Sequence, residues 1–168
     1  LVNFVLQADS LIQNTWLNWM FLWGTDSVSL SSGTADYAGP DGLNIYDLSK
    51  NENGATKTFF LDGNYIQAEE YSYVKDTLSG FTTNGTPVLM VVLPNNQLRS
   101  IPTPAAAHTV TFDYFKKPTV MTVNTSTSSI PSIYHWSIVY RAMILYGNHE
   151  NAPEIKVAGQ EGFVVGVT

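Results

Sequence analysis

Three histidines and a scatter of acidic residues are the side chains in this sequence with the clearest potential for chemistry. His108, His135 and His149 are the only histidines in 168 residues. His135 and His149 lie 14 positions apart, which is too far along one helix for both to bind a single metal ion. The sequence has no cysteine, so thiolate zinc sites and cysteine nucleophiles are excluded. We therefore expect no bound metal and no cofactor.

The acidic residues have the chemistry of glycoside hydrolysis or calcium binding but not the spacing. Glu69 and Glu70 are adjacent, and adjacent side chains diverge on a helix instead of flanking one bond. Asp41, Asp47 and Asp62 lack the alternate spacing, fixed glycine and closing glutamate of a calcium loop. The motifs of α/β-hydrolases, P-loop proteins, dinucleotide-binding folds and zinc proteases are also absent. We predict no catalytic residues and a protein that is not an enzyme. A Ser–His–Asp set assembled in space is the remaining enzymatic alternative.

Composition limits the classes of partner. Hydrophobic residues make up 44% of the chain and charged residues only 13%, which suggests a surface covered by other proteins. The net charge is −6, and Lys116–Lys117 is the only pair of adjacent basic residues, so tight nucleic-acid binding is disfavoured. No apolar stretch is long enough to cross a bilayer, because polar residues interrupt the apolar start of the chain. We therefore expect no membrane partner.

Two segments show the apolar spacing of amphipathic helices. In residues 1–24, apolar residues recur at steps of four and three from Leu1 to Trp23, before Gly24. In residues 130–155, Ser132 is a candidate N-cap after Pro131, and Pro153 suits the first turn of a third helix. Neither apolar face can be buried alone, so we expect the helices to pack on each other. The predicted core of this bundle consists of Ile12, Trp16, Trp19, Trp23, Trp136, Tyr140 and Met143.

The region between the helices has strand and turn signals. Asp62–Gly63 reads as a hairpin turn, Val88–Leu93 as a buried strand, and Leu98–Ile101 as its partner. Thr109–Phe115 alternates, with Val110, Phe112 and Tyr114 on one face. Residues 25–32 read as a polar connector and residues 68–78 as a short helix.

These signals predict an α+β protein in which a small helical bundle carries a β-rich insertion. We expect the bundle to comprise residues 1–24 and 130–162, the insertion residues 25–129, and a C-terminal extension residues 163–168. Since large apolar residues fill the bundle, replacing Trp136 with alanine should cost several kcal/mol of folding or assembly free energy, as large core truncations do, and abolish no reaction.

Two features are candidate partner interfaces. Arg141 lies among apolar residues, where an arginine is usually paired with a carboxylate of the same fold or of another subunit. The extension is β-branched and nearly uncharged, which suits addition to a neighbour's sheet. Its interface candidates are Phe163, Val164, Val165 and Val167.

The order of several motifs resembles that of the head-to-tail adaptor, or connector, proteins of tailed bacteriophages. The first is the tryptophan-rich "WLNWMFLW" at residues 16–23. It is followed by Gly85-Thr-Pro87 before a strand, Pro102-Thr-Pro104 after the next one, a strand that contains Tyr114 and ends near Pro118, and Ile130–Pro131 opening an aromatic helix. The usual Tyr-x-x-Pro strand entry is here Tyr37–Pro40, followed by an insertion.

The resemblance implies a structural virion protein, assembled in the host cytoplasm, that forms a ring of commonly twelve copies between the portal and the tail or nozzle. Phage DNA passes through such a ring without specific binding. Family members build the ring body from helices and often grip the portal with a C-terminal extension, a role that would fall here to residues 163–168. The alternative reading is a β-rich carbohydrate- or receptor-binding module that uses Tyr37, Tyr46 and Tyr65 as stacking platforms.

Overall fold

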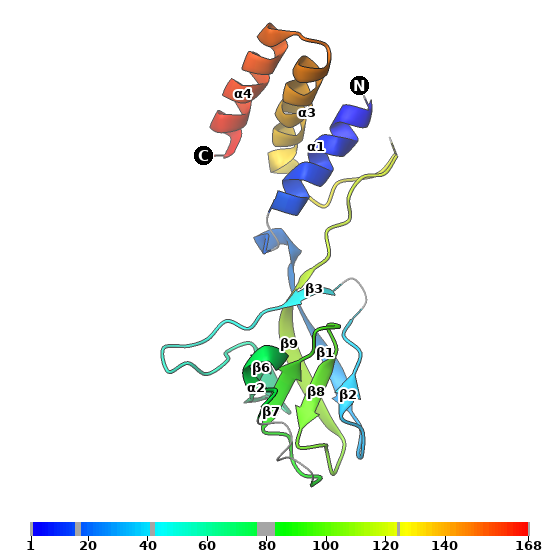
Figure 1. The fold of residues 1–168 in the computed structure, drawn as a ribbon, viewed down its shortest axis with the longest axis vertical. Coiled ribbons are helices and arrows are strands. Elements are labelled where there is room, and N and C mark those ends of the chain that lie inside the picture. Colours follow the sequence, from blue (N-terminus) through cyan, green and yellow to red (C-terminus); the bar gives the residue numbers. More distant parts are fainter. Residues whose placement is uncertain (1, 16–17, 41–42, 77–82, 124, 168) are drawn as a thin grey trace. The chain divides into compact units, whose positions relative to one another are not determined.

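A computed structural model describes residues 2–15, 18–40, 43–76, 83–123 and 125–167. The chain divides into two compact units (Figure 1). The helical unit contains Leu1–Leu22 and Pro118–Thr168, and the β unit contains Trp23–Lys117. The protein is thus α+β, with helices in its N- and C-terminal regions and a β-rich region between them, as the sequence predicts. Within the described residues, no helix has both the length and the apolar character needed to span a bilayer.

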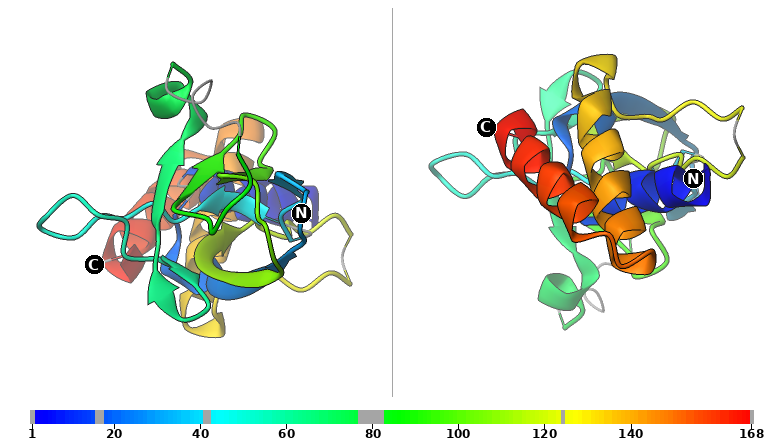
Figure 2. Two further views of the ribbon diagram at one scale, coloured as in Figure 1. Left: turned by 90° about the horizontal axis from the view of Figure 1, so that it is seen from below. Right: turned by 90° about the horizontal axis from the view of Figure 1, so that it is seen from above.

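The helical unit has three main helices, α1 (Val2–Thr15), α3 (His135–His149) and α4 (Pro153–Val167). Short 3₁₀ segments, η1 (Met20–Leu22) and η3 (Ser132–Tyr134), follow α1 and precede α3. Helix α3 lies between α1 and α4 (Figures 1 and 2). The α1–α3 core is built from Ala8, Ile130, Ile138 and Ala142, with Phe4, Ile12, Phe21, Met121 and Leu145 packed against them.

Glycines allow α3 and α4 to approach closely. A Cβ atom at Gly159 would lie 2.8 Å from the Tyr140 carbonyl oxygen, and one at Gly162 would lie 2.3 Å from the Tyr140 ring. At Gly147 a Cβ would lie 2.7 Å from the Lys156 backbone nitrogen. All three distances are shorter than van der Waals contact, so the hairpin of α3 and α4 depends on these residues lacking side chains.

The β unit contains two sheets. The first pairs β1 (Trp23–Leu30), β9 (His108–Lys116), β4 (Phe59–Leu61) and β5 (Asn64–Tyr65) in that order, and β3 (Leu43–Tyr46) also pairs with β9. The second has the order β2 (Asp36–Tyr37), β8 (Leu98–Ile101), β7 (Leu89–Val92), β6 (Gln67–Glu70). Helix α2 (Tyr71–Val74) follows β6 directly.

The β-unit core is aromatic and aliphatic and takes side chains from both sheets. Phe59, Phe112 and Tyr46 pack ring against ring, with centroids 5.0–6.0 Å apart. The other buried members are Leu30, Tyr37, Ile66, Ala68, Met90, Leu98, Val110 and Tyr114. The predicted alternation of Val110, Phe112 and Tyr114 is therefore confirmed, because all three side chains are buried. The predicted turn at Asp62–Gly63 is confirmed as well, and both residues have positive φ.

Several predicted elements differ from the structure. The first helix ends at Thr15, and residues 23–30 form a strand where the sequence suggested the end of a helix and a polar connector. All eight residues of β1 pair with β9, from Trp23↔Phe115 to Leu30↔His108, so tertiary pairing overrides the local helical pattern. Residues 67–74 form β6 and α2 where one helix, residues 68–78, was predicted.

The unit boundaries also differ from the predicted ones. Residues 23–24 belong to the β unit, and residues 118–129 belong to the helical unit through contacts with α1. Residues 163–167 continue α4 as a helix, which corrects the prediction of a β-like extension. Gly159 and Gly162, which precede this β-branched stretch in the same helix, pack against α3.

Candidate functional site

The helical unit exposes a cluster of large apolar side chains at the start of α3. Ile133, Tyr134, Trp136 and Val139 have exposed fractions between 41% and 76%, and Trp136 itself is 66% exposed. We call these four residues the Trp136 surface. Ile133, Trp136 and Val139 are spaced by three and so share one side of the helix, and Tyr134 lies in the turn before α3. Apolar side chains exposed singly are normal, whereas several exposed on one side of a helix often mark an interaction site.

The Trp136 surface is held in place by the helices beneath it. The Trp136 ring packs beside the Tyr140 ring, with centroids 6.1 Å apart, and Tyr140 in turn covers Gly162 of α4. His135 Nε2 lies 2.8 Å from the Ile130 carbonyl oxygen, so the first turn of α3 is tied to the segment before it. A surface that is ordered before binding loses less entropy when a partner covers it.

Charge is sparse around this surface. Of the 22 charged residues of the chain (8 basic and 14 acidic), the helical unit contributes six. They are Asp9, Arg141, Glu150, Glu154, Lys156 and Glu161. The stretch Pro118–His149 contains no acidic residue and a single arginine. Burying the Trp136 surface against another protein would therefore strip water from few charged groups.

A buried carboxylate connects α1 to the segment before α3. Asp9 is fully buried and accepts hydrogen bonds from the Met121 backbone N–H (2.9 Å), Gln13 Nε2 (2.9 Å) and the Ser128 hydroxyl. Gln13 Nε2 also donates to the Thr119 carbonyl oxygen at 3.4 Å. These contacts fix residues 119–130 on α1, and this segment leads directly into the Trp136 surface.

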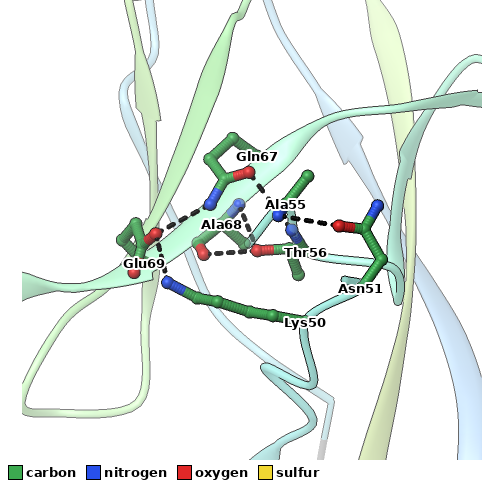
Figure 3. Close-up of polar contacts among 7 residues, drawn as sticks. All are labelled: Lys50, Asn51, Ala55, Thr56, Gln67, Ala68 and Glu69. Carbon is green, nitrogen blue, oxygen red and sulfur yellow. Dashed lines mark hydrogen bonds and ion pairs between the residues drawn. The ribbon is translucent and has the colours of Figure 1, made fainter. Parts of the chain in front are cut away.

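The β unit carries a projecting loop, residues 47–58, that is anchored at its base (Figures 1 and 3). The Thr56 hydroxyl donates to the Ala68 carbonyl oxygen (2.7 Å) and accepts from the Ala68 N–H (3.1 Å). Lys50 forms an ion pair with Glu69 (2.6 Å), which also accepts from Gln67 Nε2 (2.7 Å).

At the tip of the same loop, Asn51 Oδ1 accepts from the N–H groups of Asn53 and Ala55, both at 3.0 Å. The loop is therefore a defined polar projection, held by side-chain contacts at both its base and its tip.

Two polar side-chain pairs join segments of the β unit. Arg99 donates to both carboxylate oxygens of Asp36, at 2.6 and 2.8 Å, and this hydrogen bonding lowers the pKa of Asp36 and raises that of Arg99. Asp62 lies 2.6 Å from His108 Nδ1 and accepts from the Thr109 N–H, and the contact with His108 is the main cause of its lowered pKa. These pairs lock neighbouring strands, because each joins residues far apart in the sequence.

A shallow hollow of about 440 Å³ lies beside Asp62. It is lined by Leu61, Asp62, Asn64, Tyr65, Ile66, Gln67, Thr86, Pro87 and Val88. Tyr65 is 71% exposed and packs on Phe60, with ring centroids 4.5 Å apart. Tyr37 and Tyr46, also expected as stacking platforms, are buried in the core, and burial raises the pKa of Tyr46. The structure therefore contradicts the expected role of these two tyrosines in carbohydrate binding.

The structure separates the residues predicted to share the bundle core. Ile12 packs against the α1–α3 core, and Trp19 stacks on Phe21 with ring centroids 5.6 Å apart. Tyr140 and Met143 face α4, where both lie close to Gly159 or Gly162. Trp16 lies outside the described residues.

Two tryptophans lie outside the core, which corrects the prediction. Trp23 is 44% exposed. It belongs to the β unit, because it begins β1 and pairs with Phe115 of β9. Trp136 follows the predicted helical period but occupies the exposed side of α3 near its start. Truncating Trp136 should therefore cost the single chain less folding free energy than a core truncation would, since little of the area of that side chain is buried there.

The predicted interface residues lie on α3 and α4. Arg141 is half-buried and forms no ion pair with the residues that the structure describes. Phe163 is partly buried and Val164 is exposed, both within α4. The backbones of Val165 and Val167 are helical, and their side chains lie outside the described part of the structure.

The apolar spacing of residues 1–24 gave no indication that the polar side chains of Asp9 and Gln13 are buried. The available signal was that Asp9 is the only charged residue among the first 25. Among the described residues, no group of three or more His, Cys, Asp or Glu side chains is arranged to hold a metal ion.

One protein-family model, described as "SU10 adaptor protein", matches residues 1–162 of the chain. This range includes α1, the whole β unit, α3 and most of α4. No curated protein matches the chain at a significant level.

Proposed function

Since this chain belongs to the SU10 adaptor protein family, a family of phage head-to-tail adaptors, we propose that it forms a ring between the portal protein and the tail or nozzle protein. The family identifies a structural component of a phage virion. The match over residues 1–162 is the observation on which the proposal depends. The Trp136 surface supports it, because an exposed apolar surface of this kind is suited to being covered by another protein in an assembly.

In this proposal the ring is a homo-oligomer, with twelve copies as the expected number, assembled in the host cytoplasm before it becomes part of the virion. Phage DNA passes through it during ejection without specific binding. The net charge of −6 supports this role, because a conduit must let a polyanion slide and lysine or arginine clusters would hold it.

The proposed role is structural and not enzymatic. The polar pairs that the structure brings together, Asp36 with Arg99 and Asp62 with His108, join neighbouring strands and are explained by that role. Arg141 and the C-terminal end of α4 remain proposed contacts with the portal protein or with another copy.

Light scattering of the purified protein, followed by negative-stain electron microscopy, tests the proposal. We expect the chain alone to have a mass several times 18.5 kDa, or to join a larger complex on addition of the portal protein, with ring-shaped particles in either case. A chain that stays monomeric in both conditions, or that converts a substrate, would contradict it. An electrophoretic mobility assay with duplex DNA at low salt should show no retention by the assembled protein.

A further inference from the structure

The helical unit has two different uncharged faces. The first is the Trp136 surface, whose two aromatic side chains together expose roughly 170–290 Å² if a fully exposed aromatic offers about 150–250 Å². A standard interface buries about 800 Å² per partner, of which roughly 60% is apolar. The exposed apolar area of these two side chains, together with that of Ile133 and Val139, approaches this apolar area. The surface is therefore large enough to form the centre of a stable contact.

The second uncharged face is the exposed side of α1. Asp9 is the only charged residue in this helix, and it is fully buried. Every exposed side chain of α1 is consequently uncharged, which is unusual for a helix that faces water along four turns. The exposed residues are Val2, Asn3, Val5, Gln7, Leu11, Asn14 and Thr15.

The two faces belong to different helices of one compact unit. Helix α1 lies on one side of α3 and α4 on the other (Figure 2). Contact between two different faces of identical chains is heterologous, and a heterologous contact that closes produces a ring. Contact of one face with itself would instead stop at a dimer.

We infer that the Trp136 surface of one copy packs against the exposed side of α1 in the next copy. This inference rests on the proposed function and names the contact that would build the ring. The amides of Asn3, Gln7 and Asn14 are suitable partners for the hydroxyl of Tyr134 and the indole N–H of Trp136, whose polar atoms must find partners when the rings are covered. Leu11, which is 43% exposed, supplies the apolar contact.

Charge placed in either face should abolish assembly, because a carboxylate buried without a partner is strongly unfavourable. We would purify Trp136→Glu and Leu11→Glu and compare their masses with that of wild type by sedimentation velocity over a range of concentrations. Val157→Glu is the matched control, since Val157 is 49% exposed on α4 and belongs to neither face. Circular dichroism verifies that each variant retains its helices.

The inference predicts monomers for both single variants and wild-type assembly for the control. It also predicts that a 1:1 mixture of the two variants forms dimers and no rings. The Trp136→Glu copy keeps its α1 face and the Leu11→Glu copy keeps its Trp136 surface, so each mixed pair has one intact contact.

Assembly of either single variant as well as wild type would overturn the inference and leave the proposed function intact. The same holds for a mixture that stays monomeric, or for a Trp136→Glu variant that forms rings but no longer binds the portal or tail protein. A wild-type chain that never self-associates, even with the portal protein present, would overturn the ring proposal together with this inference.

Discussion

Replacing Asp9 with alanine tests whether the buried carboxylate holds the helical unit together. The change removes the carboxylate that accepts from the Met121 N–H, the Ser128 hydroxyl and Gln13 Nε2, and only Gln13 Nε2 keeps a second acceptor, the Thr119 carbonyl oxygen. An unsatisfied buried donor costs about 1–3 kcal/mol, and removing the carboxylate recovers part of its own desolvation cost. We expect the free energy of unfolding of the helical unit to fall by about 3 kcal/mol.

Urea denaturation followed by far-ultraviolet circular dichroism measures this loss, because the three long helices all lie in the helical unit. Ser10→Ala is the control, since the Ser10 side chain makes only an exposed contact with Asn14, and a surface change of this kind stays within about 0.5 kcal/mol. The free energy of unfolding of Asp9→Asn should lie between those of Asp9→Ala and Ser10→Ala, because asparagine keeps one acceptor oxygen but places an NH2 group where the second acceptor oxygen was.

A double-mutant cycle with Ser128→Ala separates the direct contact from general disruption. Because Asp9 and Ser128 touch, their individual losses should not add, and the coupling energy should be about 1–3 kcal/mol. An Asp9→Ala unfolding midpoint equal to that of Ser10→Ala would refute the assignment of Asp9 as the link between α1 and residues 119–130.

Three further predictions concern other parts of the chain. Gly159→Ala should lower the free energy of unfolding by about 1–2 kcal/mol, because a Cβ 2.8 Å from the Tyr140 carbonyl overpacks the α3–α4 contact by more than the roughly 1 kcal/mol gained in helix propensity. Gln160→Ala on the exposed side of α4 is its control, and equal melting of the two variants would contradict this packing. Arg99→Gln should cost under about 1 kcal/mol at pH 7, since both partners are more than a third exposed. The folded-state pKa of Asp36 is depressed, so the pair's contribution is present above the unfolded pKa near 3.8 and is lost as pH falls through the folded pKa. The difference between Arg99→Gln and wild type should therefore shrink in denaturation series below pH 3.8, and a constant difference would argue against the ion pair. Asn51→Ala should speed amide hydrogen exchange at Asn53 and Ala55, whereas Asn53→Ala should leave Ala55 protected, and equal protection in both variants would exclude the side-chain tie at the loop tip.

The alternation of buried and less buried residues along β9 could be predicted from the sequence, because one face of this strand is buried in the core. Val110, Phe112 and Tyr114 are spaced by two, and such spacing has one structural meaning when the residues between them are polar. The hairpin turn at Asp62–Gly63 was also predictable, because few residue pairs adopt two successive positive φ angles.

The end of the first helix could not be read in the same way. The spacing of Trp16, Trp19 and Trp23 continues the helical period, yet Trp23 begins a strand. The residues of that strand pair with β9 residues that lie 78 to 92 positions further along the chain, so no local window contains the information that decides its structure.

The burial of Asp9 and the exposure of Trp136 could not be predicted from the sequence for a related reason. Residue type predicts the opposite for each, since carboxylates prefer water and tryptophan prefers the core. Asp9 is buried because residues 119–130 supply donors from a distant part of the sequence. Trp136 is exposed because it lies on the side of α3 that α1 does not cover, which only the packing of the unit determines.

The helical unit is built from the two ends of the chain, and this has a consequence for synthesis on the ribosome. Helix α1 ends at Thr15, and its partner α3 begins 120 residues later at His135. At typical elongation rates of 5–20 residues per second, α1 waits roughly 6–24 s for the residues that bury its apolar side. The β unit, whose strands pair only among themselves, is complete before then. Of the two units, the helical unit is accordingly the later to fold, so a new copy gains its uncharged faces only after the residues of α3 and α4 have been translated.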